Sequence, residues 1–321
     1  MYRYLLRFSY IGTQFRGIQK TVNNILGPQD DTTTVQGCLE IALKPLRPVN
    51  PIQVTLSSRT DSGVHALETS VHFDLQSISG CPYGTRTITK VLNRQFERRG
   101  FAIRAHTVQR VSPDFHCRFN AKGRTYLYRL ALAKECRKKE DFRRSENYIF
   151  FIPIEESYRC FFVQREFDIE RLKEAAKLFV GRHDFRTFMA TNKNLRRNDA
   201  RYPVRTISDV TVKKGSPVTC SFEYEKANRL YDYWDIEFTG NSFLYKQVRR
   251  MVGALVAVGF GQITLRDTYE MLTVPSKNSW DERIQVMPSY GLYLCKVHYD
   301  EEDLKINEVE SKEGEEVEIE W

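Results

Sequence analysis

The chain has 321 residues, of which 41% are hydrophobic and 28% are charged. This composition is that of a globular protein, and the length leaves room for two domains or for one large domain with a duplicated core. No apolar run approaches the ~18 residues that a membrane span requires, so we expect no membrane segment. The amino-terminal residues alternate as a strand does and lack the features of a secretory signal or an organellar presequence.

Charge is divided unevenly along the chain. The formal net charge is +8, yet residues 300–321 hold eleven acids and two lysines, a balance of −9. Residues 1–299 therefore carry +17, which is typical of a protein that binds a polyanion such as nucleic acid. We expect the acidic segment 300–321 to be a disordered tail.

The seven cysteines are scattered, odd in number and form no C-x-x-C pair. This pattern indicates a reducing intracellular compartment, and it is typical neither of a disulfide framework nor of a cysteine zinc site. The six histidines are also dispersed and form no H-E-x-x-H motif. The sequence predicts no bound metal and no cofactor.

The first part of the chain predicts strands and helices in the order β, α, β, β, α, β. Residues 1–10 read as a strand, and residues 35–46 have helical spacing after a capping box formed by Thr33 and Gln36. The polar segment 20–34 reads as a surface loop. Further strands are expected at 51–56, 70–75 and 101–108, and a weaker helix at 85–97. This order suits an α+β sandwich with helices on one antiparallel sheet.

The second part repeats this order of elements, although not the residues themselves. Strands are expected at 124–130, 206–213, 218–224, 231–239 and 290–299, and helices at 167–179 and 243–258. Segment 134–147 reads as a charged loop. Segment 186–205 places Phe188 and Tyr202 among arginines, which suits contact with RNA as well as it suits a solvated basic loop.

The stretch SSRTDSGVHA, residues 57–66, falls between two predicted strands. It places one acid, Asp61, two residues after Arg59 and two before Gly63, on a loop from which a rigid sheet can aim a side chain. An Asx-type turn, in which Asp61 accepts backbone N–H bonds ahead of Gly63, explains the same residues. From this stretch alone, a turn and an active-site acid are equally good interpretations.

Residues 243–258 form the strongest predicted helix. At 3.6 residues per turn, Arg250 falls opposite the apolar face and is expected to meet water, whereas Arg249 falls at the edge of that face. A guanidinium in such a place is usually paired, or its stem packs while its head reaches water. If the two parts of the chain face each other across a cleft, Asp61 is the natural partner of Arg249.

Six motifs follow one another along the chain: YIGTQFRG (10–17), VQGCLEIAL (35–43), SSRTDSGVHA (57–66), DFHCRFNAKGRTYLYR (114–129), GNSFLYKQVRRMVGALVAVG (240–259) and GLYL (291–294). In this order and at these spacings, the chain resembles the TruA family of tRNA pseudouridine synthases. It is most similar to the eukaryotic branch called tRNA pseudouridine synthase-like, whose known animal members are linked to mitochondria.

The resemblance implies a role for several residues. Asp61 would be the catalytic aspartate, and Arg59 would enter the RNA where the target nucleotide leaves the stack. Tyr126 would pack against the target uracil, and Arg249 would pair with Asp61. Leu294, or Leu292 beside it, would form a wall of the pocket.

The resemblance also implies a fold and partners. It predicts two related α+β sandwiches of the ferredoxin or RRM type that share a largely antiparallel sheet with a central basic cleft. The halves would be residues 1–110 and 111–299, followed by the tail 300–321. The expected partners are tRNA and a second copy of the chain in a homodimer, and the expected location is the mitochondrion or the cytoplasm.

The chemistry of pseudouridine formation suits these residues. The reaction breaks the N1–C1′ bond, rotates the base and forms a C5–C1′ bond, so it needs neither a metal nor a redox cofactor. One carboxylate can act as nucleophile or as base, and the target base must be extruded from the stack. An inactive paralogue that only binds RNA would share the charge and the aromatics. The D-[ST]-G form of residues 61–63 also occurs in aspartic proteases, but the chain has no second copy of it.

Overall fold

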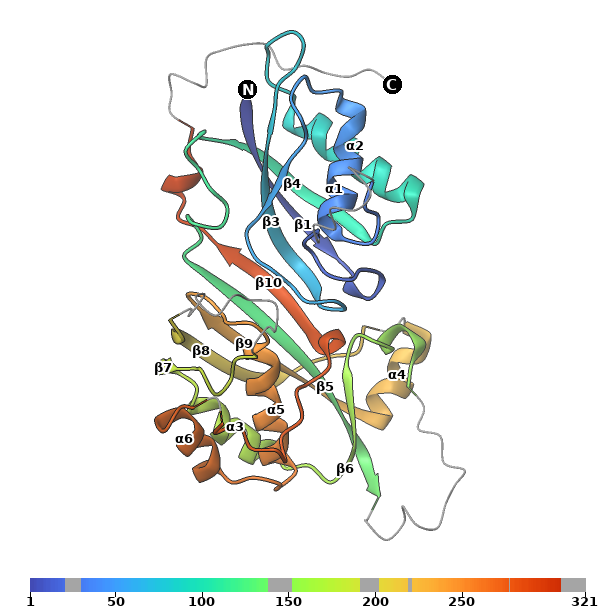
Figure 1. Cartoon of the computed structure of the whole chain (residues 1–321). Helices are drawn as coiled ribbons and strands as arrows, with labels where there is room; N and C mark the ends of the chain where they lie inside the picture. Colours follow the sequence, from blue (N-terminus) through green and yellow to red (C-terminus); the bar gives the residue numbers. More distant parts are fainter. Residues whose placement is uncertain (21–29, 138–151, 191–201, 219–220, 277, 307–321) are drawn as a thin grey trace. The chain divides into compact units, whose positions relative to one another are not determined.

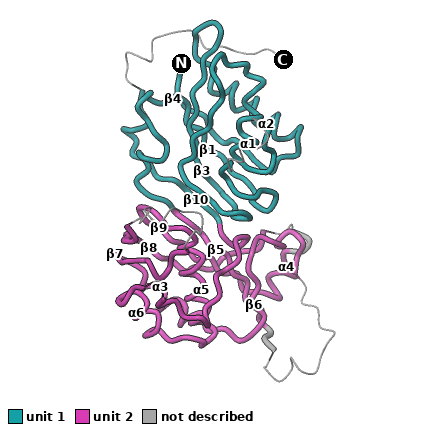
Figure 2. The backbone as a smooth tube through the Cα atoms, in the orientation of Figure 1, with its two compact units in different colours: residues 1–124, 293–321 teal, residues 125–292 magenta. Residues whose placement is uncertain are grey.

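The computed structural model describes residues 1–20, 30–137, 152–190, 202–218, 221–276 and 278–306 (Figure 1). The chain divides into two compact units, which Figure 2 shows in separate colours. Unit 1 is Met1–Arg124 with Tyr293–Trp321, and unit 2 is Thr125–Leu292. Among the described residues, no helix combines the length and the apolarity that crossing a bilayer requires.

Unit 1 is a sheet with two helices on one face (Figure 1). Its elements are β1 (Tyr2–Tyr10), α1 (Val35–Leu43), β2 (Val54–Leu56), β3 (His65–Leu75), α2 (Thr85–Arg99), β4 (Ile103–Val111) and β10 (Leu292–His298). The order of the strands is β4-β1-β3, and both the short β2 and the start of β10 pair with β3. All of these pairings are antiparallel except that of β10 with β3. The βαββαβ order and this sheet are those of a ferredoxin-like unit.

The segment between β4 and β5 packs on unit 1. Its side chains join a buried cluster of Leu5, Val111, Phe115 and Cys117, against which Tyr299 and Leu304 pack. The Tyr299 hydroxyl donates to the carbonyl of Cys117 at 2.6 Å. These contacts place the boundary of unit 1 at residue 124, whereas the sequence predicted a division at 110, and they place the residues that follow Leu292 in unit 1 as well.

Unit 2 also consists of paired strands with its own helices. Its elements are β5 (Gly123–Arg137), β6 (Phe161–Arg165), α3 (Ile169–Lys177), β7 (Gly181–Asp184), β8 (Val204–Lys214), α4 (Ser221–Leu230), β9 (Tyr231–Gly240), α5 (Gln247–Gly259) and α6 (Leu265–Thr273). The order of the strands is β5-β9-β8-β7, with β6 parallel to β5 and with β7–β8 and β8–β9 antiparallel. Helix α3 packs against α5, α6 and β8.

The predicted α+β class with a largely antiparallel sheet is confirmed. The central basic cleft stays a prediction. The predicted charged loop 134–147, the centre of segment 186–205, most of loop 20–34 and most of the acidic tail lie outside the described residues, although β5 continues as a strand to Arg137.

The strand predicted at 218–224 is wrong, because α4 begins at Ser221. Residues 221–224, Ser-Phe-Glu-Tyr, alternate polar and aromatic side chains, which is a pattern of period two. The later residues follow a helical period instead: Ala227 is fully buried, in a cluster with Ala131, Ala133, Cys160, Tyr231 and Tyr233. Packing of this later part overrides the local alternation.

Two helix starts also differ from the prediction. Helix α1 is capped by Thr34, whose side chain accepts the N–H of Gly37, and not by Thr33. Helix α5 begins at Gln247 and not at residue 243, because Lys246 has a left-handed φ of 58° and the Gln247 side chain accepts the N–H of Leu244 at 2.8 Å. Strands β6 and β7 and helix α6 were not predicted.

Candidate active site

Asp61 lies on the loop that joins β2 to β3, as the sequence predicts. The Asp61 carbonyl accepts the N–H of Val64 at 3.2 Å, and Gly63 has a φ of 78°. This is the geometry of a type II turn, which needs a positive φ at its third residue. A turn is therefore present here, and the main-chain carbonyl of Asp61 closes it, whereas the Asx-type bond to the Asp61 side chain stays a prediction. The residue itself is half-buried.

A second loop, between β1 and α1, supports both sides of Asp61. The Tyr10 hydroxyl lies 2.6 Å from the Thr60 hydroxyl, and the Ile18 N–H donates to the Thr60 carbonyl at 3.4 Å. The Ser62 hydroxyl donates to the Phe15 carbonyl at 3.3 Å. Since the residues before and after Asp61 are both bonded to this second loop, the position of the acid is set by the surrounding structure.

Gly12 is the point of closest approach between the two loops. A Cβ atom on Gly12 would lie 1.9 Å from the carbonyl oxygen of Val64. The Gly12 N–H donates to Nδ1 of the buried His65 at 3.1 Å, and the His65 ring stacks on Tyr293 with 4.6 Å between centroids. No larger residue fits at Gly12 without moving the loop that carries Asp61.

We expect Gly12→Ala to reduce catalysis at least tenfold and to destabilise unit 1. The added methyl group must displace the Val64 carbonyl, and a displacement of about 1 Å at an active site can cost ~10²-fold in rate. The rate of the reaction that the resemblance implies and the free energy of unfolding measure the two effects. Gly80→Ala is the control: Gly80 has a φ of 77° and nothing within 4 Å of an added Cβ, so this change should destabilise the fold and leave the rate unchanged. Equal rates in the two variants would contradict the tight contact.

Two other predicted residues belong to unit 1. Arg59 is exposed on the same loop as Asp61. Leu294 is fully buried on β10, where it pairs with Ala66 at the start of β3. The structure thus brings Arg59 and Asp61 together on one loop and places Leu294 beside the strand that follows this loop.

Sequence reasoning missed Arg124. Its Nε donates to the Ser58 hydroxyl at 2.8 Å, and its Nη2 donates to the Ser57 carbonyl at 2.9 Å. The half-buried guanidinium therefore anchors the start of the Asp61 loop to the first residues of β5. The available signal was an arginine that directly precedes the Thr-Tyr-Leu-Tyr strand.

Tyr126 and Arg249 lie in unit 2. Tyr126 is 7% exposed on β5, and its ring meets Phe243 edge to face with 5.0 Å between centroids. Arg249 is half-buried on α5, and its Nε donates to the Met287 carbonyl at 2.6 Å while the Met287 N–H donates to the Arg249 carbonyl at 3.2 Å. The pairing of Arg249 with Asp61 would join the two units and stays a prediction, as does the contact of Tyr126 with a target base.

The prediction for Arg250 is wrong. Its guanidinium lies over the Trp280 ring, 3.8 Å from the centroid, and Nη1 donates to the Met189 carbonyl at 3.2 Å. Burial lowers the pKa of Arg250 below its ordinary value. The helical period showed the direction of this side chain, but it could not show that the segment around Trp280 covers that face.

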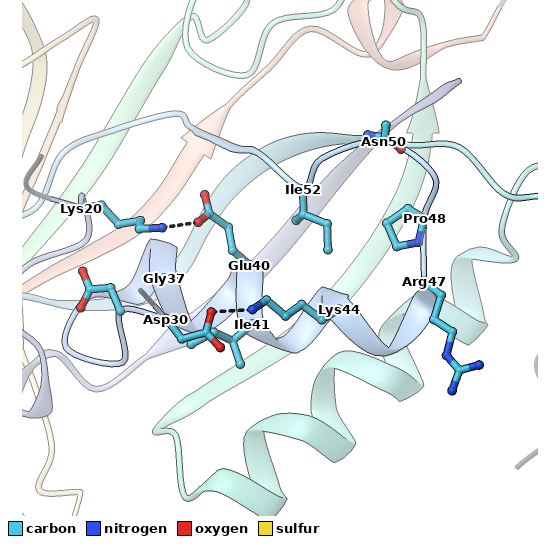
Figure 3. Close-up of a pocket in the computed structure, with 11 residues that line it drawn as sticks. Lys20, Asp30, Gly37, Glu40, Ile41, Lys44, Arg47, Pro48, Asn50 and Ile52 are labelled. Atoms are coloured by element: carbon cyan, nitrogen blue, oxygen red, sulfur yellow. Dashed lines mark hydrogen bonds and ion pairs between the residues drawn. The ribbon is translucent and has the colours of Figure 1, made fainter. Parts of the chain in front are cut away.

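A hollow of about 430 Å³ lies beside α1 (Figure 3). Four of the charged side chains that line it form two ion pairs, Lys20 with Glu40 at 2.7 Å and Lys44 with Asp30 at 2.5 Å, and a third acid, Asp31, pairs with Arg16 at 3.3 Å. An acid that is already paired in this way is a poor candidate for a catalytic base, so we do not assign chemistry to this hollow.

One group of potential metal ligands occurs in the described part of the chain: His72, His116 and Cys117, whose ligand atoms lie within 4.8 Å of one another. These atoms already serve as hydrogen-bonding links. His72 Nδ1 accepts the Cys117 N–H at 3.2 Å, and the Cys117 thiol donates to the Thr55 carbonyl at 3.2 Å. Burial raises the pKa of Cys117 to about 12, which keeps the thiol protonated and weakens it as a ligand. The group fastens the 115–118 turn to β3.

The same group makes stability depend on pH. Burial lowers the pKa of His72 to about 4 from an ordinary value of 6.5, so His72 is neutral in the fold and takes up a proton more readily when unfolded. Neutral His72 therefore contributes in full to the free energy of unfolding above pH 6.5, and this contribution is lost as the pH falls toward 4. At pH 5 the loss in the free energy of unfolding is about 2 kcal/mol. Urea unfolding at pH 7 and pH 5 measures this loss. A His72→Gln variant that retains the full pH dependence would exclude His72 as its source.

Comparison with known proteins identifies the family. The tRNA pseudouridine synthase family model matches residues 175–300. The chain is 35% identical to tRNA pseudouridine synthase-like 1 of Xenopus laevis, over 94% of this chain and 93% of the relative. It is 36% identical to the Homo sapiens protein of the same name, over 92% of this chain and 90% of that protein. It is 32% identical to tRNA pseudouridine synthase A of Limosilactobacillus fermentum, over 94% of this chain and 97% of that protein. The chain therefore belongs to the TruA-type family of tRNA pseudouridine synthases, which are isomerases.

Proposed function

We propose that the chain converts uridine to pseudouridine in tRNA with Asp61 acting at the glycosidic centre of an extruded nucleotide. The observation that carries the proposal is the support of Asp61. Its loop is bonded to Tyr10 at the end of β1, to the β1–α1 loop through Thr60 and Ser62, and to the side chain of Arg124. A carboxylate held in this way is preorganised for chemistry, and membership of the family gives the reaction.

The proposed reaction conserves every atom of the nucleotide. The N1–C1′ bond breaks, the uracil rotates, and C5 bonds to C1′. The hydrogen on C5 is then released as a proton, and N1 gains one. Asp61 serves as the nucleophile or as the base in this sequence.

The other predicted residues have supporting roles in the proposal. Arg59, exposed beside Asp61, fills the place in the RNA that the flipped nucleotide leaves. Tyr126 offers a ring to the uracil, and Arg249 pairs with Asp61 and orients it. Leu294 closes the pocket on the side of β10. The positive charge of residues 1–299 supplies most of the affinity for tRNA, which should fall as salt rises.

Release of tritium from tRNA transcripts labelled at uridine C5 tests the proposal, because the label leaves only when C5 forms its new bond. Enzyme in excess over tRNA gives the rate of a single turnover. Tritium release with a matching gain of pseudouridine is the expected result. Tight binding of tRNA without release, from every tRNA pool tried, would favour an RNA-binding paralogue that lacks activity.

We also propose a homodimer in a reducing compartment, either the mitochondrion or the cytoplasm. In support of the compartment, Cys38, Cys81, Cys117, Cys160 and Cys295 are free thiols. Light scattering should report twice the 37.7 kDa chain mass, and fractionation of cells that express the full chain should locate it.

A further inference from the structure

Helix α2 has an exposed face that carries one sign of charge. Arg86, Lys90, Arg94 and Arg98 recur at every fourth residue and are all exposed. At 1.5 Å of rise per residue, this α2 stripe is ~18 Å long. The opposite face of α2 is buried and consists of Ile88, Val91, Leu92, Gln95 and Phe96.

Several exposed bases on α3 and α6 are instead paired with acids on the same helix or at its start. On α3, Lys173 lies 2.8 Å from Glu170, and on α6, Arg266 lies 2.8 Å from Glu270. Such pairs at i,i+3 and i,i+4 are usual on a solvated helix. Three bases of the α2 stripe, Arg86, Lys90 and Arg98, do not follow this pattern.

The α2 helix contains five bases and one acid, Glu97. In the part of the chain that the structure describes, Arg86, Lys90 and Arg98 have no ion-pair partner. Like charges four residues apart destabilise a helix, so folding alone does not favour the stripe.

The helix dipole explains only one end of the stripe. Cations are favourable in the last turn, where Arg98 lies, but unfavourable in the first turn, where Arg86 lies. The helix is also firmly held: the Asn93 side chain donates to the Ala105 carbonyl at 3.0 Å and accepts the Ala105 N–H at 2.9 Å. The stripe is thus presented on a rigid element.

We propose that the α2 stripe binds the sugar-phosphate backbone of tRNA, as a contact separate from the Asp61 loop. The inference rests on the proposed function for the identity of the polyanion. At roughly 3.4 Å of rise per phosphate in a duplex strand, a stripe of ~18 Å spans about five phosphates. Phosphate contacts of this kind set the position of the RNA and do not read its bases.

The test removes three charges from the stripe and three from elsewhere. The stripe variant combines Arg86→Gln, Lys90→Gln and Arg98→Gln. The control variant combines Arg171→Gln, Lys173→Gln and Arg266→Gln, which replace exposed or partly exposed bases on α3 and α6. Binding of unmodified tRNA to the full chain is measured from 0.05 to 0.3 M salt, and turnover is measured on the same preparations.

The stripe variant should bind tRNA roughly tenfold or more weakly than the control. Its plot of log K against log salt should be shallower by about 2, because each phosphate that a base no longer neutralises lowers the slope by ~0.7–0.9. The rate at saturating tRNA should not change while KM rises, whereas failure of the proposed function would abolish turnover in every variant. Equal affinities and equal slopes in the two variants would overturn the inference. Tighter binding of tRNA by the stripe variant would also overturn the inference, and it would favour the acidic residues 307–321, instead of tRNA, as the group that binds the stripe.

Discussion

Replacing Asp61 with asparagine is expected to lower the rate of a single turnover by ~10³-fold or more. Asparagine has nearly the same shape as aspartate, but its amide can neither attack the glycosidic centre nor accept a proton there. The affinity for tRNA should stay within about twofold of the wild type, because phosphate contacts and not one loop acid supply most of the binding. The loss should therefore appear in kcat and not in KM.

A matched control separates loss of chemistry from loss of charge. Glu68 is a half-buried acid on β3, seven residues after Asp61, so Glu68→Gln removes one negative charge from the same region. This variant should turn over at the wild-type rate. Equal thermal midpoints would show that both variants fold. An Asp61→Asn enzyme that still releases tritium at the rate of the Glu68→Gln enzyme would refute the catalytic role of Asp61.

The Asp61 loop could be predicted because its signals are local. A strand pattern stands on each side of it, and Gly63 marks the turn within it. The residues that hold the loop could not be predicted in this way. Gly12 and Arg124 lie far from Asp61 in sequence. Their contacts depend on where β1 ends and where β5 begins. A pattern of hydrophobic residues carries no information about such contacts.

The limits of the fold prediction have the same origin. Strand β1 was recognised because polar and apolar residues alternate along most of it, whereas α4 was misread because only its first residues were weighed. Strand β10 was found, but its parallel pairing with β3 joins residues more than 220 positions apart. Since no local pattern specifies that partner, the unit to which β10 belongs became apparent only from the structure.

Replacing Glu156 with alanine is expected to destabilise unit 2 by about 3–5 kcal/mol. Glu156 is fully buried, and its Oε2 lies 2.8 Å from Nη1 of Arg129, which is 6% exposed. Glu156 also accepts the N–H of Val218, and Arg129 donates to the carbonyl of Ser216 at 2.7 Å. Removal of the carboxylate leaves a buried guanidinium without its main counter-ion and frees the 216–218 segment. Urea unfolding followed by tryptophan fluorescence reports on unit 2 through Trp234 and Trp280.

A double variant tests whether the unpaired charge is the cause. Arg129→Met together with Glu156→Leu removes both charges, so it should be less destabilising than Glu156→Ala, because an apolar pair can replace a buried ion pair at little cost. The exposed pair of Lys214 and Asp232, 2.8 Å apart, provides the comparison: Lys214→Ala should change the stability by less than about 1 kcal/mol. If the double variant is as unstable as Glu156→Ala, the loss comes from the hydrogen bonds to the 216–218 segment. The charge of Arg129 would then contribute little to the stability of unit 2.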